Sequence, residues 1–381
     1  MIDIKDKSLC TGCTACVSAC PVQCIVMRRD REEGFDYPVA NPDLCIGCGK
    51  CESVCPVLNP LKESRPMASF AARCGNDMKD SSSGGVFPKL ASEVIANGGK
   101  VYGAAFDEEF NVVHKEIADI EGINELRGSK YVQSELYSTF EDVGYELGEG
   151  RRVLFSGTPC QVAGLKKYLG KDSPLLLTVD CACHGVPGPG LWTMYRKALT
   201  ERHGTLKHVA FRDKGRGWCH YDFNVNGKVV PYMKDPYMAL FAQDMTLRPS
   251  CYRCPVRNGR SGSDLTLADL WNVAEVVPEM NDDRGVSLVC INTERGGEVF
   301  ESVRSCLDVK PVVHELAINN NGGFAEQVQV PERRAEFFIG MHSAKDLHAY
   351  MTGFVVRKSL PVRAYKTARR LLVKLKRKIL K

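Results

Sequence analysis

Long apolar runs are missing from this 381-residue sequence, since none approaches the roughly 18 residues that a membrane-spanning helix needs. An apolar secretory signal is missing too, because the N-terminus, MIDIKDKSLC, is charged. The H-E-x-x-H, Walker A and G-x-S-x-G motifs do not occur, and residues 185–190 lack the G-x-G-x-x-G spacing. These absences argue against a secreted or membrane-spanning protein and against direct NAD binding. We expect a cytoplasmic protein.

Acidic residues are missing from residues 357–381, a segment that holds 11 Lys or Arg. The rest of the chain has 40 basic and 46 acidic residues, a net charge of −6, which argues against a general nucleic-acid binder. Apolar residues of the basic segment follow helical spacing: Ala364, Ala368, Leu371, Leu375 and Ile379. The pattern predicts a basic amphipathic helix that lies on an anionic membrane surface. The alternative is a helix packed on the acidic body or on a partner subunit.

Cysteine is abundant, with 18 residues, nine of them within the first 55. Disulfides are rare in a reducing compartment, so clustered cysteines indicate metal ligation. The spacing C-x2-C-x2-C-x3-C-P occurs twice, first at Cys10, Cys13, Cys16 and Cys20 and then at Cys45, Cys48, Cys51 and Cys55. This spacing is typical of two-cluster bacterial ferredoxins, in which the fourth cysteine of each run binds the other 4Fe-4S cluster. One predicted cluster therefore uses Cys55 in place of Cys20, and the other uses Cys20 in place of Cys55.

Residues 1–60 are accordingly predicted to form a small bacterial-type ferredoxin domain that passes single electrons between its clusters. Gly12 and Gly47 lie between the first two ligands of each run, where a residue without Cβ lets the backbone turn its N–H groups toward sulfur. The alternative, structural zinc, uses two C-x2-C pairs rather than a run of four. Cys24 lies outside the pattern and is expected to be a core residue. Residues 61–67 read as a linker.

Residues 68–356 alternate between strand-like and helix-like segments, which predicts a larger α/β or α+β domain of unknown strand order. The expected helices are residues 86–96, 136–147, 161–169, 191–202 and 298–303. The expected strands are residues 101–106, 151–155, 174–179, 263–268 and 286–291. A hairpin is expected to turn at Asn226 and Gly227.

Four of the remaining cysteines could hold a third cluster, and our choice is Cys160, Cys183, Cys251 and Cys254, with Cys181 as the reserve for Cys183. For the C-x2-C pair Cys251 and Cys254, a zinc site or a redox dithiol remains open. Cysteines at other positions are expected to be core or incidental thiols: Cys74, Cys219, Cys290 and Cys306.

Several polar segments could bind a cofactor or substrate. The loop Ser82, Ser83, Gly84 and Gly85 precedes a helix and suits a phosphate, although it also suits an ordinary helix cap. Lys130 offers a cation for a phosphate or ring oxygen, and Tyr131 offers a flat ring. The alternative is that both residues belong to an ordinary polar loop. His184 could donate a proton, or be a structural histidine. FRDKGRGW, with Arg212, Lys214 and Arg216, could grip an anionic substrate, or be a solvated loop.

Taken in order, SSSGGVF, GSKYVQS, FSGTPCQVAGL, DCACHGVPGPG, FRDKGRGW, CYRCP and SDLTLADLW resemble the beta-subunit family of coenzyme F420 hydrogenases and dehydrogenases. The resemblance covers roughly residues 68–340, and members of the family often carry a fused two-cluster ferredoxin domain. It implies FAD bound beside a 4Fe-4S cluster, with electrons paired on the flavin and leaving as hydride. On this resemblance, residues 82–85 and Lys130 are candidate FAD contacts, and Thr158, Cys160 and Gln161 are candidate lining of the flavin and cluster site.

The resemblance thus implies an iron-sulfur flavoprotein oxidoreductase. Members of the family differ in their acceptor, which is coenzyme F420 in some and another small molecule in others, and many accompany surface-polysaccharide genes. The expected partner is a ferredoxin or a hydrogenase- or dehydrogenase-type subunit. One alternative is a non-catalytic electron-transfer subunit that feeds a partner enzyme, and another is an assembly protein with structural clusters. Bound flavin would favour the oxidoreductase.

Overall fold

A computed structural model describes residues 1–75, 78–319, 321–325 and 327–356 of the chain. The predicted basic helix of residues 357–381 lies outside the described residues. No helix in the described part combines the length and the apolar character needed to span a bilayer.

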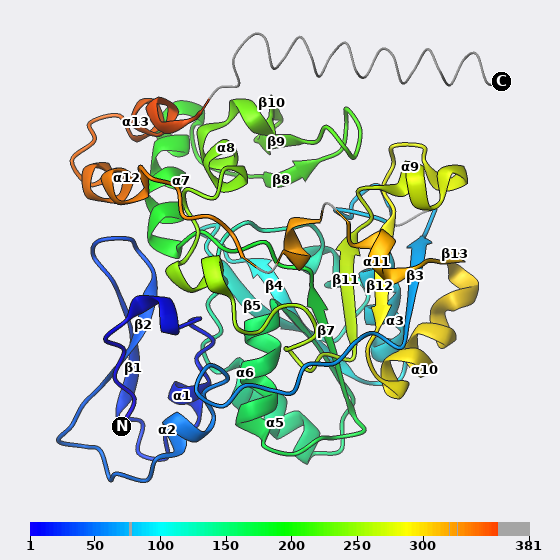
Figure 1. Cartoon of the computed structure of the whole chain (residues 1–381), viewed down its shortest axis with the longest axis horizontal. Helices are drawn as coiled ribbons and strands as arrows, with labels where there is room; N and C mark the ends of the chain where they lie inside the picture. Colours follow the sequence, from blue (N-terminus) through cyan, green and yellow to red (C-terminus); the bar gives the residue numbers. More distant parts are fainter. Residues whose placement is uncertain (76–77, 320, 326, 357–381) are drawn as a thin grey trace.

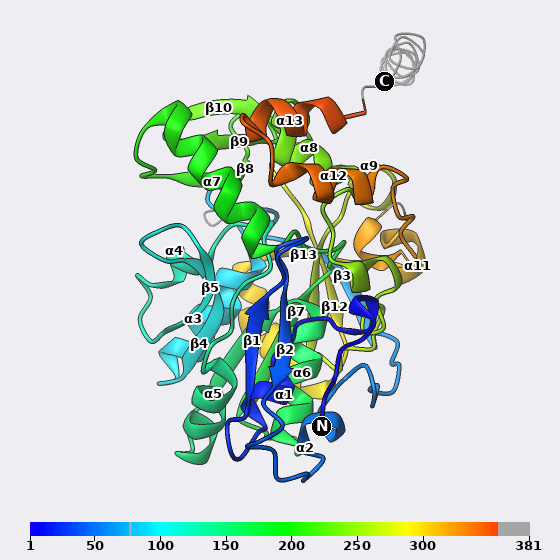
Figure 2. The ribbon, with the colours of Figure 1, turned by 90° about the vertical axis from the view of Figure 1, so that its left-hand side faces the viewer.

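The N-terminal segment folds around a two-stranded antiparallel sheet. Its elements are η1 (Lys7–Leu9), α1 (Ala15–Ser18), β1 (Ile25–Arg29), β2 (Asp36–Ala40) and α2 (Lys50–Ser53). The two cysteine runs form matching loops, because Gly12 and Gly47 both have a φ of 69°, in the left-handed region that glycine adopts without steric cost. This segment packs beside helix α6 (Pro159–Leu169), as seen in Figure 2.

An eight-stranded mixed sheet forms the centre of the larger part of the chain (Figure 1). The strand order is β13-β3-β12-β11-β7-β6-β4-β5, with the inner strands β4, β6, β7 and β11 parallel and the flanking strands antiparallel. The strands are β3 (Ala68–Arg73), β4 (Lys100–Phe106), β5 (Val112–Ile117), β6 (Val153–Gly157), β7 (Leu176–Cys181), β11 (Leu265–Asp269), β12 (Ser287–Ile291) and β13 (Asp308–Pro311).

Helices cover both faces of this sheet, because its strands are apolar on both sides. Along β6, Leu154 packs into the cluster that contains α3, whereas Val153 and Phe155 pack toward α5 and α6. On the first side lie α3 (Val86–Ala96), α4 (Ile123–Leu126) and α10 (Glu294–Val303), and on the second lie α5 (Thr139–Gly148) and α6 (Pro159–Leu169). The predicted small ferredoxin part followed by a mixed α/β domain is confirmed.

A second layer of structure lies above the carboxyl ends of the parallel strands (Figure 1). It contains a three-stranded sheet and the helices around it: α7 (Pro189–His203), β8 (Val209–Asp213), β9 (Asp222–Val225), β10 (Lys228–Pro231), η2 (Tyr232–Lys234), α8 (Pro236–Ala242), α12 (Arg334–Met341) and α13 (Leu347–Phe354). The hairpin of β9 and β10 turns at Asn226 and Gly227, as predicted, and both residues have positive φ.

Short elements connect these layers: η3 (Pro249–Arg253), α9 (Val273–Val276), η4 (Pro278–Met280), η5 (Arg304–Cys306), α11 (His314–Ala317) and η6 (Gly322–Phe324). Several predicted boundaries move by a few residues. Strand β6, for example, covers Val153–Gly157 rather than residues 151–155, and strand β7 covers Leu176–Cys181 rather than residues 174–179. Helix α10 begins at Glu294 rather than at residue 298, because the Thr293 side chain caps it by accepting from the Gly296 N–H. Helix α5 begins at Thr139, after Leu136 has already packed into the core.

Candidate functional site

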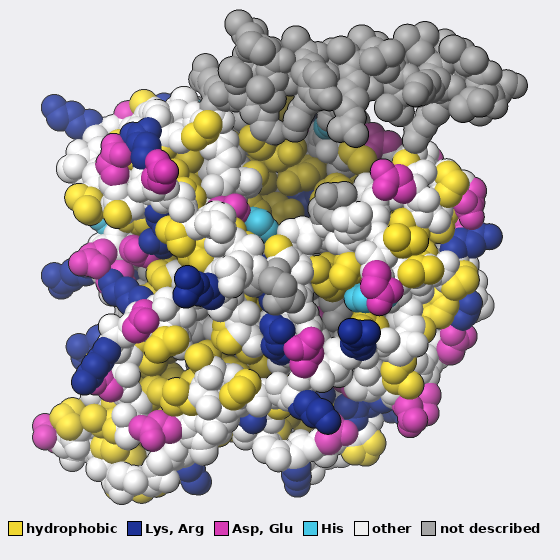
Figure 3. Space-filling view, in the orientation of Figure 1, with side chains coloured by type: hydrophobic (Ala, Val, Ile, Leu, Met, Phe, Trp, Pro, Cys, Tyr) yellow, Lys and Arg dark blue, Asp and Glu magenta, His cyan; other side chains and the backbone are white. Residues whose placement is uncertain are grey.

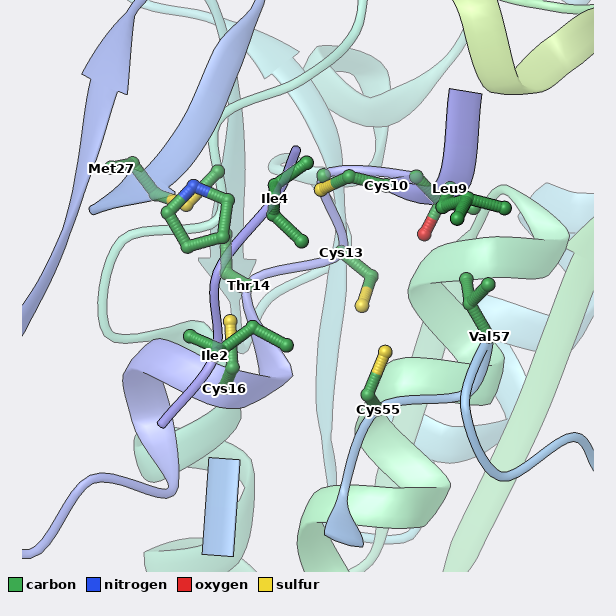
Figure 4. A pocket seen from close by; sticks show the side chains of 13 residues that line it. Ile2, Ile4, Leu9, Cys10, Cys13, Thr14, Cys16, Met27, Cys55 and Val57 are labelled. Atoms are coloured by element: carbon green, nitrogen blue, oxygen red, sulfur yellow. The ribbon is translucent and has the colours of Figure 1, made fainter. Parts of the chain in front are cut away.

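Four cysteines from the two N-terminal runs line one small apolar pocket. Cys10, Cys13 and Cys16 come from the first run and Cys55 from the end of the second, and we call these four the inner set. In Figure 4, the sulfur atoms of Cys13 and Cys55 point toward one another, with Ile2 and Ile4 nearby. The pocket therefore brings together the cysteines that the crossed ferredoxin pattern assigns to one cluster.

The other four cysteines of the runs, which we call the outer set, are Cys20, Cys45, Cys48 and Cys51. Cys20, Cys45 and Cys51 pack in one cluster that also contains Cys16 of the inner set. Cys48 is exposed, and the neighbouring Ile46 side chain is 64% exposed. Cys24, which was expected in the core, is buried, and its sulfur lies 3.4 Å from that of Cys20. The outer set thus reaches the protein surface at Cys48, whereas Cys51 is buried.

The inner set lies directly against helix α6 of the larger domain. A Cβ atom built on Gly164 would come within 3.0 Å of the Cys13 Cβ and within 3.1 Å of its sulfur. Only glycine permits this approach of the helix backbone to a ligand loop. The same helix carries Cys160 one turn earlier, so α6 connects the inner set to the next group of cysteines.

Three separate segments bring Cys160, Cys183, Cys251 and Cys254 near one another, and we call these the pocket set. Cys160 lies at the start of α6, Cys183 follows strand β7, and the other two lie on and after η3. Burial raises the pKa of Cys160, and the nearby Cys254 and Cys251 raise it further. Burial also raises the pKa of Cys183, with contributions from Cys181 and from all three other members of the pocket set. Burial, followed by the neighbouring Asp180 carboxylate, raises the pKa of Cys181, which ends β7.

The chemistry of these sets fits iron-sulfur clusters. Within the described residues, no three His, Cys, Asp or Glu side chains converge closely enough to hold a single metal ion. A cubane is wider than one ion and separates its four thiolates accordingly. Burial raises the pKa of Cys16 and of Cys160 to about 12, and a bound metal would favour the thiolate form of both.

A cavity of about 800 Å³ opens beside the pocket set, at the carboxyl ends of β6, β7 and β11. This is the edge at which open α/β sheets bind ligands, and the volume suits a large cofactor. Cys160, Cys181 and Cys183 form part of its wall. The Ser81 Oγ and the Arg212 Nε and Nη2 atoms, on two other lining residues, are buried without a hydrogen-bond partner in the described structure. Such polar atoms fit a polar, phosphate-bearing group such as FAD.

The predicted phosphate loop borders this cavity. Ser82, Ser83 and Gly85 line it, whereas Gly84 packs behind it with its N–H on the Ser287 hydroxyl. A Cβ on Gly84 would lie 2.3 Å from the Ala72 carbonyl oxygen, so this glycine permits close packing against strand β3. The Ser82 hydroxyl already accepts a hydrogen bond from the Ser129 N–H, with 2.6 Å between the hydroxyl oxygen and the Ser129 nitrogen.

Lys130 also lines the cavity, but its ammonium group donates to the carbonyl oxygens of Glu125, Arg127 and Gly128. Burial lowers the pKa of Lys130 to about 7. Thr158 and Gln161 line the same cavity from the start of α6. The Gln161 side chain accepts from the Thr158 N–H at 2.9 Å, and the Thr158 hydroxyl lies 3.1 Å from the Cys160 sulfur, so this pair orients a member of the pocket set.

His184, the candidate proton donor, and Lys214, a candidate for gripping an anionic substrate, occupy different places. His184 lines the cavity and its Nε2 pairs with Asp244. Lys214 lies outside the set of lining residues, and its ammonium group donates to the backbone carbonyls of Met78, Ser83 and Arg284. Lys214 thus fastens the phosphate loop from behind instead of facing the cavity.

Sequence reasoning missed three residues of this site. Asp244 could not be found, because 60 residues separate it from His184. Asp180 lines the cavity with a buried Oδ1 that has no partner in the described structure, and burial raises its pKa to about 6. Its position immediately before Cys181 in DCACHG was the available signal. Arg248, buried beside Cys10, lies three residues before Cys251, which was also a signal.

His114 supports the cavity wall as a neutral ring. Its Nδ1 lies 2.9 Å from the Ser134 hydroxyl and its Nε2 lies 3.0 Å from the Ser156 carbonyl oxygen. Burial lowers the pKa of His114 to about 4. In the unfolded chain, a histidine has a pKa of about 6.5, so it is protonated at a higher pH than the buried His114 of the folded chain. The free energy of unfolding that His114 contributes above about pH 6.5 is therefore lost as the pH falls. We expect His114 to account for a loss of about 2 kcal/mol between pH 7.5 and 5.

Urea unfolding at several pH values checks this expectation. His114→Gln should lose less stability on acidification than the parent protein, whereas replacing the exposed His208 by Gln should leave the acid sensitivity unchanged. An identical pH dependence in His114→Gln and in the parent protein would contradict the assignment.

Comparison with known proteins gives two family matches. Residues 150–315 match the family model for the C terminus of the coenzyme F420 hydrogenase/dehydrogenase beta subunit, and residues 9–59 match the 4Fe-4S dicluster domain. Among solved structures, a chain of the F420-reducing [NiFe] hydrogenase complex from Methanosarcina barkeri is 17% identical, with a TM-score of 0.46, over 73% of this chain and 90% of that chain. No curated protein matches the sequence.

Proposed function

We propose a function from the premise that this chain belongs to the coenzyme F420 hydrogenase/dehydrogenase beta-subunit family and carries a 4Fe-4S dicluster domain. It is an iron-sulfur flavoprotein oxidoreductase of the cytoplasm that exchanges electrons with a redox partner and hydride with a small-molecule acceptor. Coenzyme F420 is one candidate acceptor, by analogy with the family's name.

One observation carries this proposal: the three cysteine sets follow one another from the surface to the cavity. The outer set reaches the surface at Cys48, the inner set adjoins it at Cys16, and Gly164 lets the inner set touch α6. Cys160 then brings the pocket set to the cavity wall. When bound, the clusters supply single-electron transfer and FAD supplies the exchange between single electrons and hydride.

The chain's own residues supply binding, orientation and a proton. Ser81 and Arg212 offer unpartnered polar atoms for the cofactor or the acceptor, and the Tyr221 and Trp271 rings flank the Arg212 guanidinium at 4.6 and 5.1 Å. The Nε2 of His184 pairs with the Asp244 carboxylate beside the cavity. A hydride adds two electrons and one proton to the acceptor, so a second proton completes its reduction, and His184 is the residue we assign to deliver it.

A redox protein docks, in this proposal, where the outer set reaches the surface. Leu44 and Ile46 are both exposed beside Cys45 and Cys48, which gives a partner an apolar contact close to the predicted cluster. On the face shown in Figure 3, basic and acidic side chains are interspersed, which agrees with a protein partner better than with nucleic acid. This exposed surface, where electrons would enter from a partner, also favours the second candidate function, an electron-transfer subunit without a flavin.

Anaerobic purification with assays of iron, sulfide and flavin tests the proposal. We expect about 12 iron atoms per chain for three cubanes, against about 8 for the dicluster domain alone, together with one FAD. Ala104→Trp fills the cavity with a ring and should remove the flavin but keep the iron, because Ala104 lines the cavity from β4, a strand without cysteine. Ile339→Trp, at a side chain that is 81% exposed, is the matched control and should keep both.

The lower iron value without flavin, after attempted reconstitution with iron, sulfide and FAD, would overturn the flavoprotein assignment. It would leave the electron-transfer subunit as the function.

A further inference from the structure

Arg248 is a fully buried cation that joins the dicluster domain to the larger domain. Its side chain is 1% exposed and lies just before η3, which carries Cys251. The guanidinium donates to three oxygens: the Cys10 carbonyl at 2.7 Å through Nε, the Gln133 amide at 3.0 Å through Nη1 and the Asp36 carbonyl at 2.9 Å through Nη2. Its Nη2 also lies 3.6 Å from the Cys10 sulfur. Four partners thus fix its position.

The three oxygen partners are neutral, and in the described part of the chain Arg248 has no carboxylate within ion-pair distance. The rings of Tyr37 and Phe35 cover its faces at 4.4 and 5.4 Å. A buried charge without a counter-charge is costly, so a retained guanidinium needs a negative group nearby. Four cysteine thiolates around a cubane core provide that charge, because their four negative charges exceed the core's positive charge in both of its usual oxidation states.

Arg248 also contacts the pocket set. Its backbone carbonyl oxygen accepts from the Cys251 N–H at 2.8 Å, at the start of η3. Arg248 therefore lies between the inner and pocket sets, and it is held by the inner set's own ligand loop at Cys10.

We propose that Arg248 is the positioning residue that sets the reduction potential of the inner-set cluster, raising it by fixed positive charge and by its hydrogen bond to the Cys10 sulfur. A positive charge and a donor to sulfur both stabilise the reduced, more negative cluster. The inner cluster then holds electrons more readily than the exposed outer cluster, which favours electron flow from the surface toward the larger domain. The inference rests on the proposed assignment of Cys10, Cys13, Cys16 and Cys55 to one cluster.

A redox titration of the intact protein, followed by the electron paramagnetic resonance of the reduced clusters, tests this role. In Arg248→Gln we expect one dicluster-domain signal to appear at a more negative potential, with the iron content unchanged. Arg248→Lys keeps the charge but cannot maintain the fork of hydrogen bonds, so its shift should have the same sign and be smaller.

Arg334→Gln is the matched control. Arg334 is also buried and also joins the two parts of the chain, through Glu33, but it contacts no cysteine among the described residues. Its replacement should leave every midpoint potential unchanged.

Unchanged potentials in Arg248→Gln would overturn the proposal, as would an equal shift in Arg334→Gln, which would assign the effect to domain contact alone. If Arg248→Gln does not retain its iron, the potentials of Arg248→Lys are measured instead. Midpoint potentials equal to those of the parent protein in Arg248→Lys would then overturn the proposal. These outcomes are separate from the flavin result, because the potentials can be measured without FAD. A parent protein without any reduced-cluster signal would instead contradict the proposed function.

Discussion

Replacement of Cys160 by serine should remove the pocket-set cluster and disconnect the cavity from the dicluster domain. The iron content should fall from about 12 to about 8 atoms per chain, because one cubane of three is lost. Cys160 lies in the first turn of α6, the helix that also touches Cys13, and it lines the cavity, so it lies between the dicluster domain and the cavity. Bound FAD should then no longer be reduced through the dicluster domain, while the dicluster signals remain.

Anaerobic iron and sulfide assays, together with the flavin absorbance after addition of a reduced ferredoxin, measure both effects. Cys181→Ser is the matched control, because Cys181 lines the same cavity and is the reserve ligand for Cys183. It should keep about 12 iron atoms and a reducible flavin.

The opposite pattern, with iron lost in Cys181→Ser and kept in Cys160→Ser, would assign the cluster to a different set of ligands. Full iron in both variants, with full flavin reduction, would show that neither cysteine is needed for the electron route.

The sequence was sufficient where one local pattern determines one local structure. The ferredoxin loops follow from cysteine spacing with Gly12 and Gly47, and helix α3 has the predicted limits because Gly85 precedes it and Gly98 follows it. The strand order could not be predicted, because the sequences of apolar strands such as β6 and β7 do not specify which strands lie beside them. Eight strands from 68 to 311 allow many orders, and the observed one depends on long-range packing.

The site shows the same division. The spacing of Cys251 and Cys254 points to ligands, but their approach to Cys160 depends on where η3 packs. The charged run with Lys214 suggested a grip on substrate, whereas in the structure the Lys214 ammonium is satisfied by three backbone carbonyls. A lysine in a glycine-rich loop has the same sequence signature in either role. Arg248 was missed because its place before the cysteine pair points to the site only when combined with its burial, which the sequence does not show.

Asp264 holds together the strands from which this site is built, and its loss should have the largest effect on stability. Its side chain is fully buried. Its Oδ2 accepts from the Thr178 N–H and hydroxyl at 2.8 and 2.6 Å on β7, and its Oδ1 accepts from the Thr293 hydroxyl at 2.8 Å and forms an ion pair with Arg295 at 2.8 Å. One carboxylate thus links β7, β11 and the start of α10.

Asp264→Ala should destabilise the protein by about 3–5 kcal/mol. It leaves Arg295 without its buried partner, and it removes the hydrogen-bond acceptor of the Thr178 N–H and of the Thr178 and Thr293 hydroxyls. Asp172→Ala is the matched control, since Asp172 pairs with the same Arg295 at 3.0 Å but its side chain is 68% exposed. That exposed pair should contribute less than about 1 kcal/mol. Urea unfolding of the purified proteins at pH 7, followed by tryptophan fluorescence, compares them. Equal midpoints for the two variants would show that the stabilisation comes from Arg295 and its exposed partner, and that the buried network around Thr178 contributes little.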